Sequence, residues 1–229
     1  MIIGSGMLAK AFAHHAQEQQ LLIFASGVSD STETRPAAFL REERLLRQAM
    51  SDYAADKLIY FSTCSIYDSS LHNSVYVQHK SYMEHLVRTC QRDFIIFRLP
   101  QVVGVTQSPT IVNFLYRQII HQQPFELWSG SKRNLLDVDD VVKVIDYILD
   151  NQLFKRQVVN LASPQSSCIY DIVAVLESLT QKRAVYTVAD KGAFYHIDLS
   201  QVQPIYHQLG IEFDADYVSR TISKYYANV

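Results

Sequence analysis

Side chains that could do chemistry gather between Tyr60 and Lys80, in the segment YFSTCSIYDSSLHNSVYVQHK. This segment is either a polar strand and helix or a proton-transfer site. Among its tyrosines, Tyr60 fits a strand and Tyr67 fits loop packing. Only Tyr76 has a lysine four residues on, and on a helix this spacing places Lys80 on the same face, one turn later. A Tyr-x-x-x-Lys pair alone does not identify a proton-transfer site, so the interpretation depends on the surrounding elements.

Short apolar runs alternate along the chain with segments of helical period, which predicts a parallel α/β sheet. The expected strands are Met1–Ile3, Leu21–Ala25, Lys57–Phe61, Phe94–Leu99 and Val158–Leu161. The expected helices are Met7–Gln19, Ala37–Met50, Tyr76–Cys90, Ile111–Gln122 and Asp139–Asn151. After Leu161 the pattern changes to a helix from Ile169, a short strand at residues 184–188 and a final helix from Tyr217. This tail predicts a small C-terminal lobe.

A glycine-rich turn stands at the front of the chain. The run GSGMLA at residues 4–9 is a G-x-G-x-x-A motif, directly after a short apolar strand and at the start of a helix. Glycines there let the backbone turn tightly and approach a pyrophosphate, and the small Ala9 lets helix and strand pack closely. The helix N-terminus offers free amides to phosphate groups. This position favours dinucleotide binding over a purely structural turn.

The chain after the glycine turn departs from a complete dinucleotide-binding fold. Such a fold normally ends its second strand in Asp or Glu, about 20 residues on, and this carboxylate binds the adenosine ribose. Here the next strand ends in ASG at residues 25–27, and the nearest acidic residue is Asp30. Either the second strand has an altered ending, or the second and third strands are deleted and this is the fourth. The helix that follows favours deletion, which exposes the first strand and weakens the hold on adenine.

The composition excludes several other classes of protein. The 229 residues are 48% hydrophobic with a formal net charge of -2, typical of a soluble globular chain with a sizeable core. No basic run indicates nucleic acid or a membrane surface as the main partner, and no stretch approaches the ~18 apolar residues of a membrane span. Three widely spaced cysteines argue against a disulfide framework or a zinc pattern and indicate the cytoplasm. His14 and His15 are adjacent on an expected helix and so face different ways, and we expect no metal site.

Seven ordered motifs are similar to those of one known family, the extended short-chain dehydrogenase/reductases, in their nucleotide-sugar epimerase/dehydratase branch. GSGMLA resembles the glycine turn of the family, and FASG its small-residue strand end beside the cofactor. FSTCSIY resembles its S-[ST]-x-x-[VI]-Y segment, and YVQHK its Y-x-x-x-K. FRLPQVVG and KRNLLDVDDVV resemble two later motifs, and VVNLAS resembles the opening of its substrate lobe. Ordered matches over nearly the whole chain are far more specific than any one of them.

The resemblance implies a Rossmann-like α/β fold that lacks the usual second and third strands. The dinucleotide-binding core would cover residues 1–160, with residues 100–140 contributing to the substrate side, and a small C-terminal substrate lobe would cover residues 161–229. Tyr76 would be the general acid/base, and the Thr63 hydroxyl would hydrogen-bond the reacting oxygen as charge develops. The ammonium of Lys80, together with an oxidised nicotinamide, would lower the pKa of Tyr76 from ~10.

The same resemblance implies the binding residues. The cofactor, NAD or NADP, would be held by Gly4, Ser5, Gly6, Met7, Leu8, Ala25, Ser26, Gly27, Lys80, Pro100 and Gln101. The nucleotide-sugar substrate would contact Thr63, Cys64, Ser65, Gln101 and Arg133. The apolar stripe of Ala37–Met50 is core or a subunit contact, and with the helix Tyr76–Cys90 it predicts the homodimer of the resembling family.

Departures from the family narrow the chemistry. Members that dehydrate nucleotide sugars carry Asp and Glu just after the hydroxyl residue, where this chain has Cys64 and Ser65. Without that carboxyl pair we expect hydride transfer that reduces a keto sugar or epimerises one carbon, rather than water elimination. Gln101 replaces the Asn of the family and keeps an amide donor, and the loop from Thr63 to Tyr76 is short.

Several residues have two interpretations. Arg133 matches the arginine that contacts a sugar-nucleotide diphosphate in the family, or it is a surface arginine paired with Asp137 or Asp139. Asp139 is the expected helix cap. Arg98 is expected in an internal structural pair. Trp128 lies either beside the substrate or in the core.

The leading interpretation is an NAD(P)-dependent oxidoreductase or epimerase acting on a nucleotide-linked sugar. A role in surface-polysaccharide synthesis is implied by the resemblance alone. The rival interpretation is a non-catalytic or cofactor-impaired descendant that keeps the fold as a binding or scaffold subunit. The missing ribose carboxylate and the apparent loss of two strands favour the rival.

Overall fold

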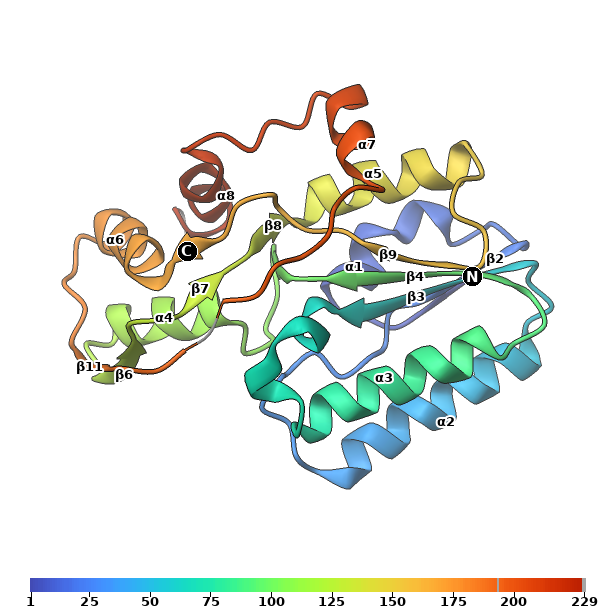
Figure 1. Ribbon diagram of the computed structural model, residues 1–229, viewed down its shortest axis with the longest axis horizontal. Helices are drawn as coiled ribbons and strands as arrows, with labels where there is room; N and C mark the ends of the chain where they lie inside the picture. Colours follow the sequence, from blue (N-terminus) through green and yellow to red (C-terminus); the bar gives the residue numbers. More distant parts are fainter. Residues whose placement is uncertain (193, 228–229) are drawn as a thin grey trace.

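A parallel sheet of five strands forms the centre of the protein (Figure 1), in a computed structural model that describes residues 1–192 and 194–227. Its strands, in their order across the sheet, are β1 (Ile2–Ile3), β2 (Leu21–Phe24), β3 (Lys57–Thr63), β4 (Asp93–Leu99) and β9 (Gln157–Asn160). All neighbouring strands in it pair in parallel. The Rossmann-like α/β fold is therefore confirmed, and each expected strand lies within two residues of its predicted bounds.

Helices cover both faces of this sheet. α2 (Pro36–Asp52) and α3 (Val75–Arg88) lie on one face, and α1 (Met7–Ala11) and α5 (Val138–Asp150) lie on the other (Figure 1). Successive strand residues point to opposite faces, so the core is divided in the same way. Leu22 and Leu58 pack towards α2 and α3, whereas the next residue of each strand packs towards α1 and α5. The apolar stripe of α2, including Leu46, is thus core.

The connection from β1 to β2 has the opposite hand to the two connections that follow it. β1 to β4 succeed one another in one direction across the sheet, yet α1 lies on one face and α2 and α3 on the other. Crossovers between parallel strands are right-handed in nearly all proteins, so a reversed one needs a cause. The deletion of two strands supplies this cause. In a complete fold α1 leads to strands on the far side of β1, and α1 keeps the face that suits that connection. Here the chain instead passes from α1 directly to β2, on the other side of β1. The expected absence of the second and third strands is confirmed.

α1 is shorter than the sequence predicts. The expected helix Met7–Gln19 ends at Ala11, and residues Ala13–His15 form a separate 3-10 turn. The start of α5 also differs from the prediction. Asp137, not Asp139, is the cap, because its Oδ1 accepts the Asp139 N–H at 2.9 Å. The backbone of Asp137 is extended, as a cap requires, so Asp139 already belongs to the first helical turn.

A second group of elements extends from the carboxyl ends of the strands. It contains the helices α4 (Ile111–Ile120), α6 (Ile169–Thr180) and α8 (Tyr217–Tyr226), which bury apolar side chains in a core of their own. Three strand pairs complete it: β5 (Gln101–Val103) with β8 (Leu135–Asp137), β7 (Lys132–Arg133) with β10 (Ser167–Cys168), and β6 (Phe125–Trp128) with β11 (Tyr186–Ala189). α7 (Gln203–Gln208) instead packs Ile205 against the main sheet. The division at residue 160 stays a prediction.

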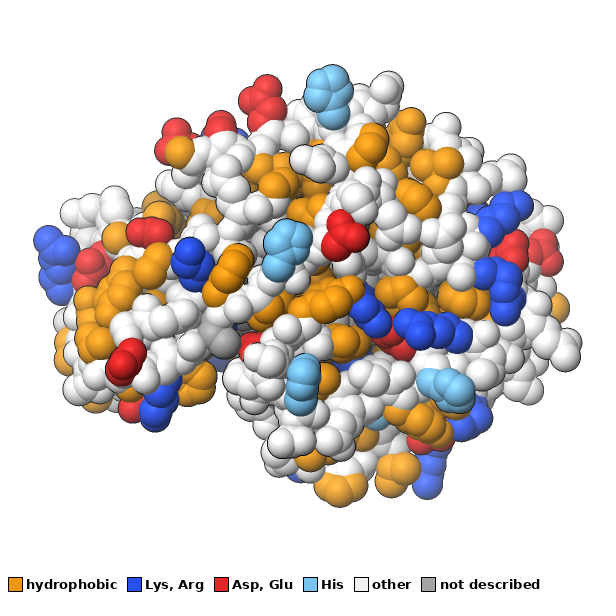
Figure 2. All heavy atoms as spheres, in the orientation of Figure 1, with side chains coloured by type: hydrophobic (Ala, Val, Ile, Leu, Met, Phe, Trp, Pro, Cys, Tyr) orange, Lys and Arg blue, Asp and Glu red, His pale blue; other side chains and the backbone are white. Residues whose placement is uncertain are grey.

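The surface carries charge of both signs. Acidic and basic side chains are interspersed over the face shown in Figure 2. This mixture differs from the basic patch that binds a nucleic-acid backbone. Within residues 1–192 and 194–227, no helix combines the length and the apolar character that crossing a membrane requires.

Candidate active site

Thr63 and Tyr76 meet at the carboxyl end of β3. Thr63 is the last residue of β3 and Tyr76 the second residue of α3, and the Thr63 side chain lies close enough to the Tyr76 hydroxyl to act on its pKa. Both residues are 6% exposed. The loop between them consists largely of two 3-10 turns, Cys64–Tyr67 and Ser69–Leu71, and Thr63 Oγ1 also accepts the Ser65 N–H at 3.0 Å. The short loop therefore brings the two hydroxyl groups together.

Lys80, one turn further along α3, is held by a buried carboxylate. Its Nζ donates to Glu42 Oε1 at 3.0 Å and to the Tyr60 hydroxyl at 3.3 Å. Glu42 is fully buried and has three further partners: the Tyr60 hydroxyl at 2.7 Å, the Val28 N–H at 2.7 Å and His79 Nε2 at 3.1 Å. Burial opposes the ionisation of Glu42, but Lys80 and these hydrogen bonds outweigh it and bring its pKa to about 2. Lys80 is therefore part of a fixed, desolvated ion pair.

Burial keeps Tyr76 in its phenol form. Removal from water raises its pKa above the ordinary value, although Lys80 and the Thr63 hydroxyl act in the other direction. The negative charge of Glu42 further disfavours a phenolate. The expected lowering of this pKa depended on an oxidised nicotinamide as well as on Lys80. Lys80 alone does not achieve it, because burial outweighs its charge and Glu42 adds to the effect of burial.

The glycine turn lies at the same edge of the sheet. Gly4 has a φ of +138°, and a Cβ there would lie 2.3 Å from the carbonyl oxygen of Ala25, so the position requires glycine. Gly6 opens α1 with open space around it. At Gly27 a Cβ would lie 2.6 Å from Lys80 Nζ. The end of β2 thus passes directly over the lysine, and the exposed turn leaves backbone accessible to a dinucleotide phosphate.

The other residues predicted to bind cofactor lie around this turn. Met7 and Leu8 are partly buried against the core of the main sheet. Ser26 accepts two hydrogen bonds from Arg41, at 3.0 Å through its carbonyl oxygen and 3.2 Å through its hydroxyl. Sequence analysis missed Arg41, because an exposed arginine on a helix gives no local sign of its partner.

Buried polar atoms without partners mark the predicted substrate side. Pro100 joins β4 to β5, and the side-chain oxygen of Gln101 after it is buried with no hydrogen bond among the described residues. Arg133 Nε and Ser131 Oγ are also buried without a hydrogen bond among the described residues. Buried polar groups ordinarily have partners, so these atoms are available to a ligand. Two of the three belong to residues that were predicted to contact substrate.

Arg133 does not form the surface ion pair that was its alternative interpretation. Lys224 occupies both carboxylates instead, donating to Asp137 Oδ2 at 2.8 Å and to Asp139 Oδ2 at 2.6 Å. Arg133 is largely withdrawn from solvent, and burial lowers its pKa, while Tyr195 and Asp68 act in the opposite direction. Among the described residues no carboxylate pairs with it.

Tyr195 was missed by sequence analysis and lies beside the predicted substrate residues. Burial raises the pKa of its hydroxyl to about 12, and the side chain of Ser65 is near enough to act on that pKa in the other direction. Cys64 is fully buried, its Sγ lies 3.3 Å from the carbonyl oxygen of Arg98, and burial raises its pKa to about 12. It is therefore a neutral thiol at neutral pH. Tyr195 belongs to an irregular segment, which offers no periodic pattern from which to infer its place.

Arg98 forms the internal structural pair that was expected. Its Nε and one terminal nitrogen donate to the buried Glu84 at 2.8 and 2.7 Å. Ser62 donates to the same carboxylate at 2.7 Å. The other terminal nitrogen donates to the Tyr67 hydroxyl at 2.7 Å, which donates in turn to Asn160 at 2.9 Å. Tyr67 therefore belongs to a polar network that joins β3, β4 and β9, and is more than loop packing.

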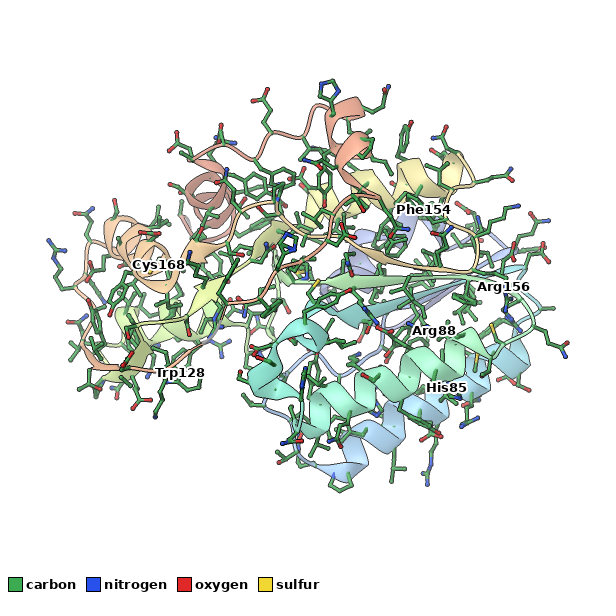
Figure 3. The ribbon with its side chains drawn as sticks, viewed as in Figure 1. His85, Arg88, Trp128, Phe154, Arg156 and Cys168 are labelled. Carbon is green, nitrogen blue, oxygen red and sulfur yellow. The ribbon has the colours of Figure 1, made fainter. Side chains whose placement is uncertain are left out.

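Trp128 is not a core residue. It lies on β6, in the C-terminal group of elements, far from His85 and Arg88 of α3 (Figure 3). It is 43% exposed, and its indole N–H donates to Glu126 at 2.7 Å. Its expected position beside the substrate stays a prediction.

A comparison with protein families shows to which family this chain belongs. The model of the NAD dependent epimerase/dehydratase family matches residues 4–162. The chain belongs to this family. The match ends near the carboxyl end of β9, so it includes the glycine turn, Thr63, Tyr76 and Lys80. A search of the curated proteins found no match.

Solved structures that contain NAD or NADPH share the fold. The UDP-glucose 4-epimerase of Thermus thermophilus in complex with NAD has a TM-score of 0.69 at 13% identity, over 96% of this chain and 82% of that one. RMD from Pseudomonas aeruginosa complexed with NADPH has a TM-score of 0.73 at 16% identity, over 99% and 97%. The UDP-glucuronic acid 4-epimerase from Bacillus cereus, in complex with UDP-glucuronic acid and NAD, has a TM-score of 0.69 at 16% identity, over 90% and 74%.

Replacing Glu42 tests the ion pair in this epimerase/dehydratase family member. Glu42→Gln leaves Lys80 buried without a counter-ion, so we expect the free energy of unfolding at pH 7 to fall by about 3–5 kcal/mol. The folded pKa of about 2 lies below the unfolded value of 4.5. The stabilisation is therefore present above pH ~4.5 and is lost as pH falls towards 2. Urea unfolding of both proteins at pH 7 and pH 3 should show a smaller difference at pH 3.

Glu43→Gln is the matched control. Glu43 is the next residue on α2, and its partner is the half-exposed Arg47, at 2.9 Å. Loss of such a surface pair costs up to about 1 kcal/mol. Equal losses in the two variants would contradict the dominance of the buried pair.

Proposed function

We propose that this chain is an NAD(P)-dependent oxidoreductase or epimerase that acts on a nucleotide sugar, and that it favours reduction of a keto sugar. The observation that carries the proposal is the buried Tyr76 hydroxyl beside Thr63, with Lys80 one turn on, at the sheet edge that also bears the glycine turn. The family match supports the class of cofactor. Neighbours that bind NAD, NADPH or UDP-glucuronic acid support the class of ligand. The proposed setting, surface-polysaccharide synthesis, rests on the family resemblance.

The chain keeps the parts that would hold the cofactor's phosphates and nicotinamide. The backbone of Gly4 and Gly6 and the start of α1 suit the pyrophosphate, because the turn is exposed and a Cβ at Gly6 would meet nothing within 4 Å. Gly27 lets the chain after β2 pass close over Lys80. When bound, the cofactor supplies hydride at nicotinamide C4. Both NAD and NADP are compatible with these residues.

Tyr76 is set to donate a proton. It is a phenol at neutral pH because it is buried and because Glu42 offsets the charge of Lys80. A phenol can protonate a substrate carbonyl oxygen as hydride reaches the carbon, and the Thr63 hydroxyl can hydrogen-bond the same oxygen. Oxidation of an alcohol, the first step of an epimerisation, would instead need Tyr76 as a phenolate. This argument favours keto-sugar reduction.

The two positions that hold the acid-base pair in dehydratases carry other side chains in this protein. The position after Thr63 holds Cys64, whose thiol is buried against the Arg98 carbonyl and has a pKa of about 12. The next position holds Ser65, whose hydroxyl lies near Tyr195. Neither side chain exchanges a proton readily at neutral pH. The proposal therefore excludes the dehydratase reaction.

Tyr76→Phe is the direct test of the proton donor. The variant keeps the ring but loses the hydroxyl, so we expect kcat with NADH or NADPH and 4-keto nucleotide sugars to fall by about 10²–10⁴-fold. Calorimetric binding of the cofactor should be unchanged. Tyr82→Phe, on the exposed side of the same helix, is the control and should retain full activity. Equal turnover by Tyr76→Phe would overturn the assigned role.

The same titration separates this proposal from its rival, a cofactor-impaired scaffold. The rival is favoured by the short edge strand β1, of only two residues, and by the missing ribose carboxylate. If wild-type protein binds neither NADH nor NADPH at millimolar concentration, the scaffold is the better account.

Arg133→Ala tests the proposed diphosphate contact. The guanidinium is buried with an unpartnered Nε, so it can bind a diphosphate without first breaking an ion pair. We expect KM for the nucleotide sugar to rise at least about 10-fold, since a charge-assisted contact contributes about 1.5–3 kcal/mol, with kcat changed less. Lys132→Ala, on the exposed neighbour in β7, should leave KM unchanged. A fall in kcat alone would contradict the binding role.

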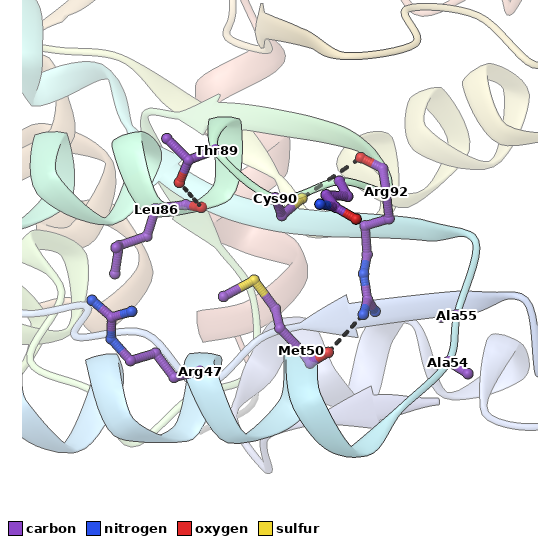
Figure 4. Close-up of a pocket in the computed structure, with 9 residues that line it drawn as sticks. Arg47, Met50, Ala54, Ala55, Leu86, Thr89, Cys90 and Arg92 are labelled. Carbon is purple, nitrogen blue, oxygen red and sulfur yellow. Dashed lines mark hydrogen bonds between the residues drawn. The ribbon is translucent and has the colours of Figure 1, made fainter.

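We also propose a homodimer through the outer faces of α2 and α3. Leu40 is 49% and Tyr82 41% exposed there, and Tyr82 links the helices by a hydrogen bond to Glu43 at 2.9 Å. A hollow of about 570 Å³ at the C-terminal ends of the two helices is lined by residues such as Met50 and Cys90 (Figure 4). It lies at the opposite end of α3 from Tyr76, so it belongs to this face and not to the active site.

Light scattering tests the dimer. Wild-type protein should show twice the 26.2 kDa mass of one chain, and Leu40→Glu should show one. Val185→Glu changes a residue of similar exposure, 47%, in the other group of elements and should stay dimeric. A wild-type monomer at high concentration would refute the interface.

A further inference from the structure

Two adjacent histidines converge on one carboxylate at the end of the α1 segment. His14 Nε2 lies 3.0 Å from Asp146 Oδ2, and His15 Nε2 lies 2.8 Å from Asp146 Oδ1. Adjacent residues of a regular helix would face different ways, but α1 has ended and the two residues stand in a 3-10 turn. Their rings lie side by side, with centroids 4.2 Å apart. The expectation that they diverge is therefore wrong.

His15 lies between two carboxylates. Its Nδ1 is hydrogen-bonded to Glu18, three residues on, and its Nε2 faces Asp146 across the gap to α5. The residue is 7% exposed, so water screens these charges poorly. Both ring nitrogens of His15 therefore face carboxylate oxygens, which hold the ring in one orientation.

We propose that this cluster is a binding site for one divalent transition metal ion of the zinc class. The ligands are Nε2 of His14, Nε2 of His15 and the carboxylate of Asp146, and the remaining position is open to water. The three ligand atoms lie within 4.8 Å of one another. Zinc bonds of about 2.0–2.2 Å hold tetrahedral ligands about 3.4 Å apart, so small side-chain movements close the site. The ion binds neutral imidazole nitrogens, so any proton carried by Nε2 of either histidine leaves to solvent on binding.

Glu18 acts on the site through His15. A carboxylate that accepts the second ring N–H of a metal-bound histidine fixes the tautomer and raises the basicity of the ligand nitrogen. Glu18 occupies that position, because it contacts Nδ1 and leaves Nε2 to face Asp146. It is a positioning residue, and its side chain is half-exposed.

The ion would join two elements that are distant in sequence. His14 and His15 follow directly on α1, the helix opened by the glycine turn, and Asp146 lies on α5. α1 has only five residues and no side-chain cap. A metal ion that bridges to α5 would hold the α1 segment in place, although this helix is so short. This role concerns the stability of the α1 segment and does not depend on the reaction proposed above.

The test is a calorimetric titration of the full chain, without an affinity tag and freed of metal by EDTA and dialysis, with ZnCl₂. We expect one Zn²⁺ per chain and a higher melting temperature with the ion. His14→Ala and Asp146→Asn should each weaken binding by at least about 10-fold, and Glu18→Gln by about 10-fold. His14 is half-exposed, so its variant keeps the fold even if Asp146→Asn does not.

Two matched controls separate this site from adventitious binding. His207→Ala removes another exposed histidine, and Asp150→Asn removes an exposed carboxylate one turn further along α5. Both should bind Zn²⁺ as the wild type does. The proposal is overturned if the wild type binds no Zn²⁺, or if His14→Ala binds Zn²⁺ as tightly as His207→Ala does.

Discussion

The buried carboxylate of Glu42 is the constraint on which the candidate site depends. It joins α2 to Tyr60 of β3, to His79 and Lys80 of α3, and to the backbone that follows β2. A buried charge is costly unless it is paired, so the Lys80 ammonium must remain in contact with this carboxylate. The same contact removes the net positive charge that would otherwise favour a phenolate at Tyr76. Glu42 thus fixes the position of Lys80 and, together with burial, disfavours a phenolate at Tyr76.

The loss of two strands changes how the fold can hold a dinucleotide. In a complete fold of this type, a carboxylate on the second strand binds the adenosine ribose, and here β1 is the edge of the sheet. The conformation of the turn at Gly4 is nevertheless closely restricted, because its backbone lies against the backbone of Ala25, which follows β2. Binding would therefore rely on the phosphate and nicotinamide ends of the cofactor. The reversed hand of the β1–β2 connection leaves α1 on the face where α5 can support it.

The sequence predicted those features whose signal is local. The five strands, the glycine turn and the Tyr76–Lys80 spacing each lie within a few consecutive residues, and the structure places the last two at one sheet edge. Glu42 was missed although a signal existed: it stands three residues after Phe39 and four before Leu46, on the buried face of α2. Tyr195 and the His15–Asp146 contact could not be predicted, because each partner lies more than a hundred residues away in sequence.

Neighbouring residues at the end of β3 are each tied to a different polar partner. Tyr60 donates to Glu42, Ser62 donates to Glu84, and the Thr63 hydroxyl, beside Tyr76, accepts the Ser65 N–H. Two buried carboxylates beside one strand cost desolvation energy that apolar residues would avoid, so stability alone does not explain them. Their effect is geometric, because their hydrogen bonds hold Tyr60 and Ser62 in place while the Ser65 N–H orients the Thr63 hydroxyl. Hydroxyl groups held in this way need little reorganisation as charge develops on a substrate oxygen, which is the condition for electrostatic catalysis.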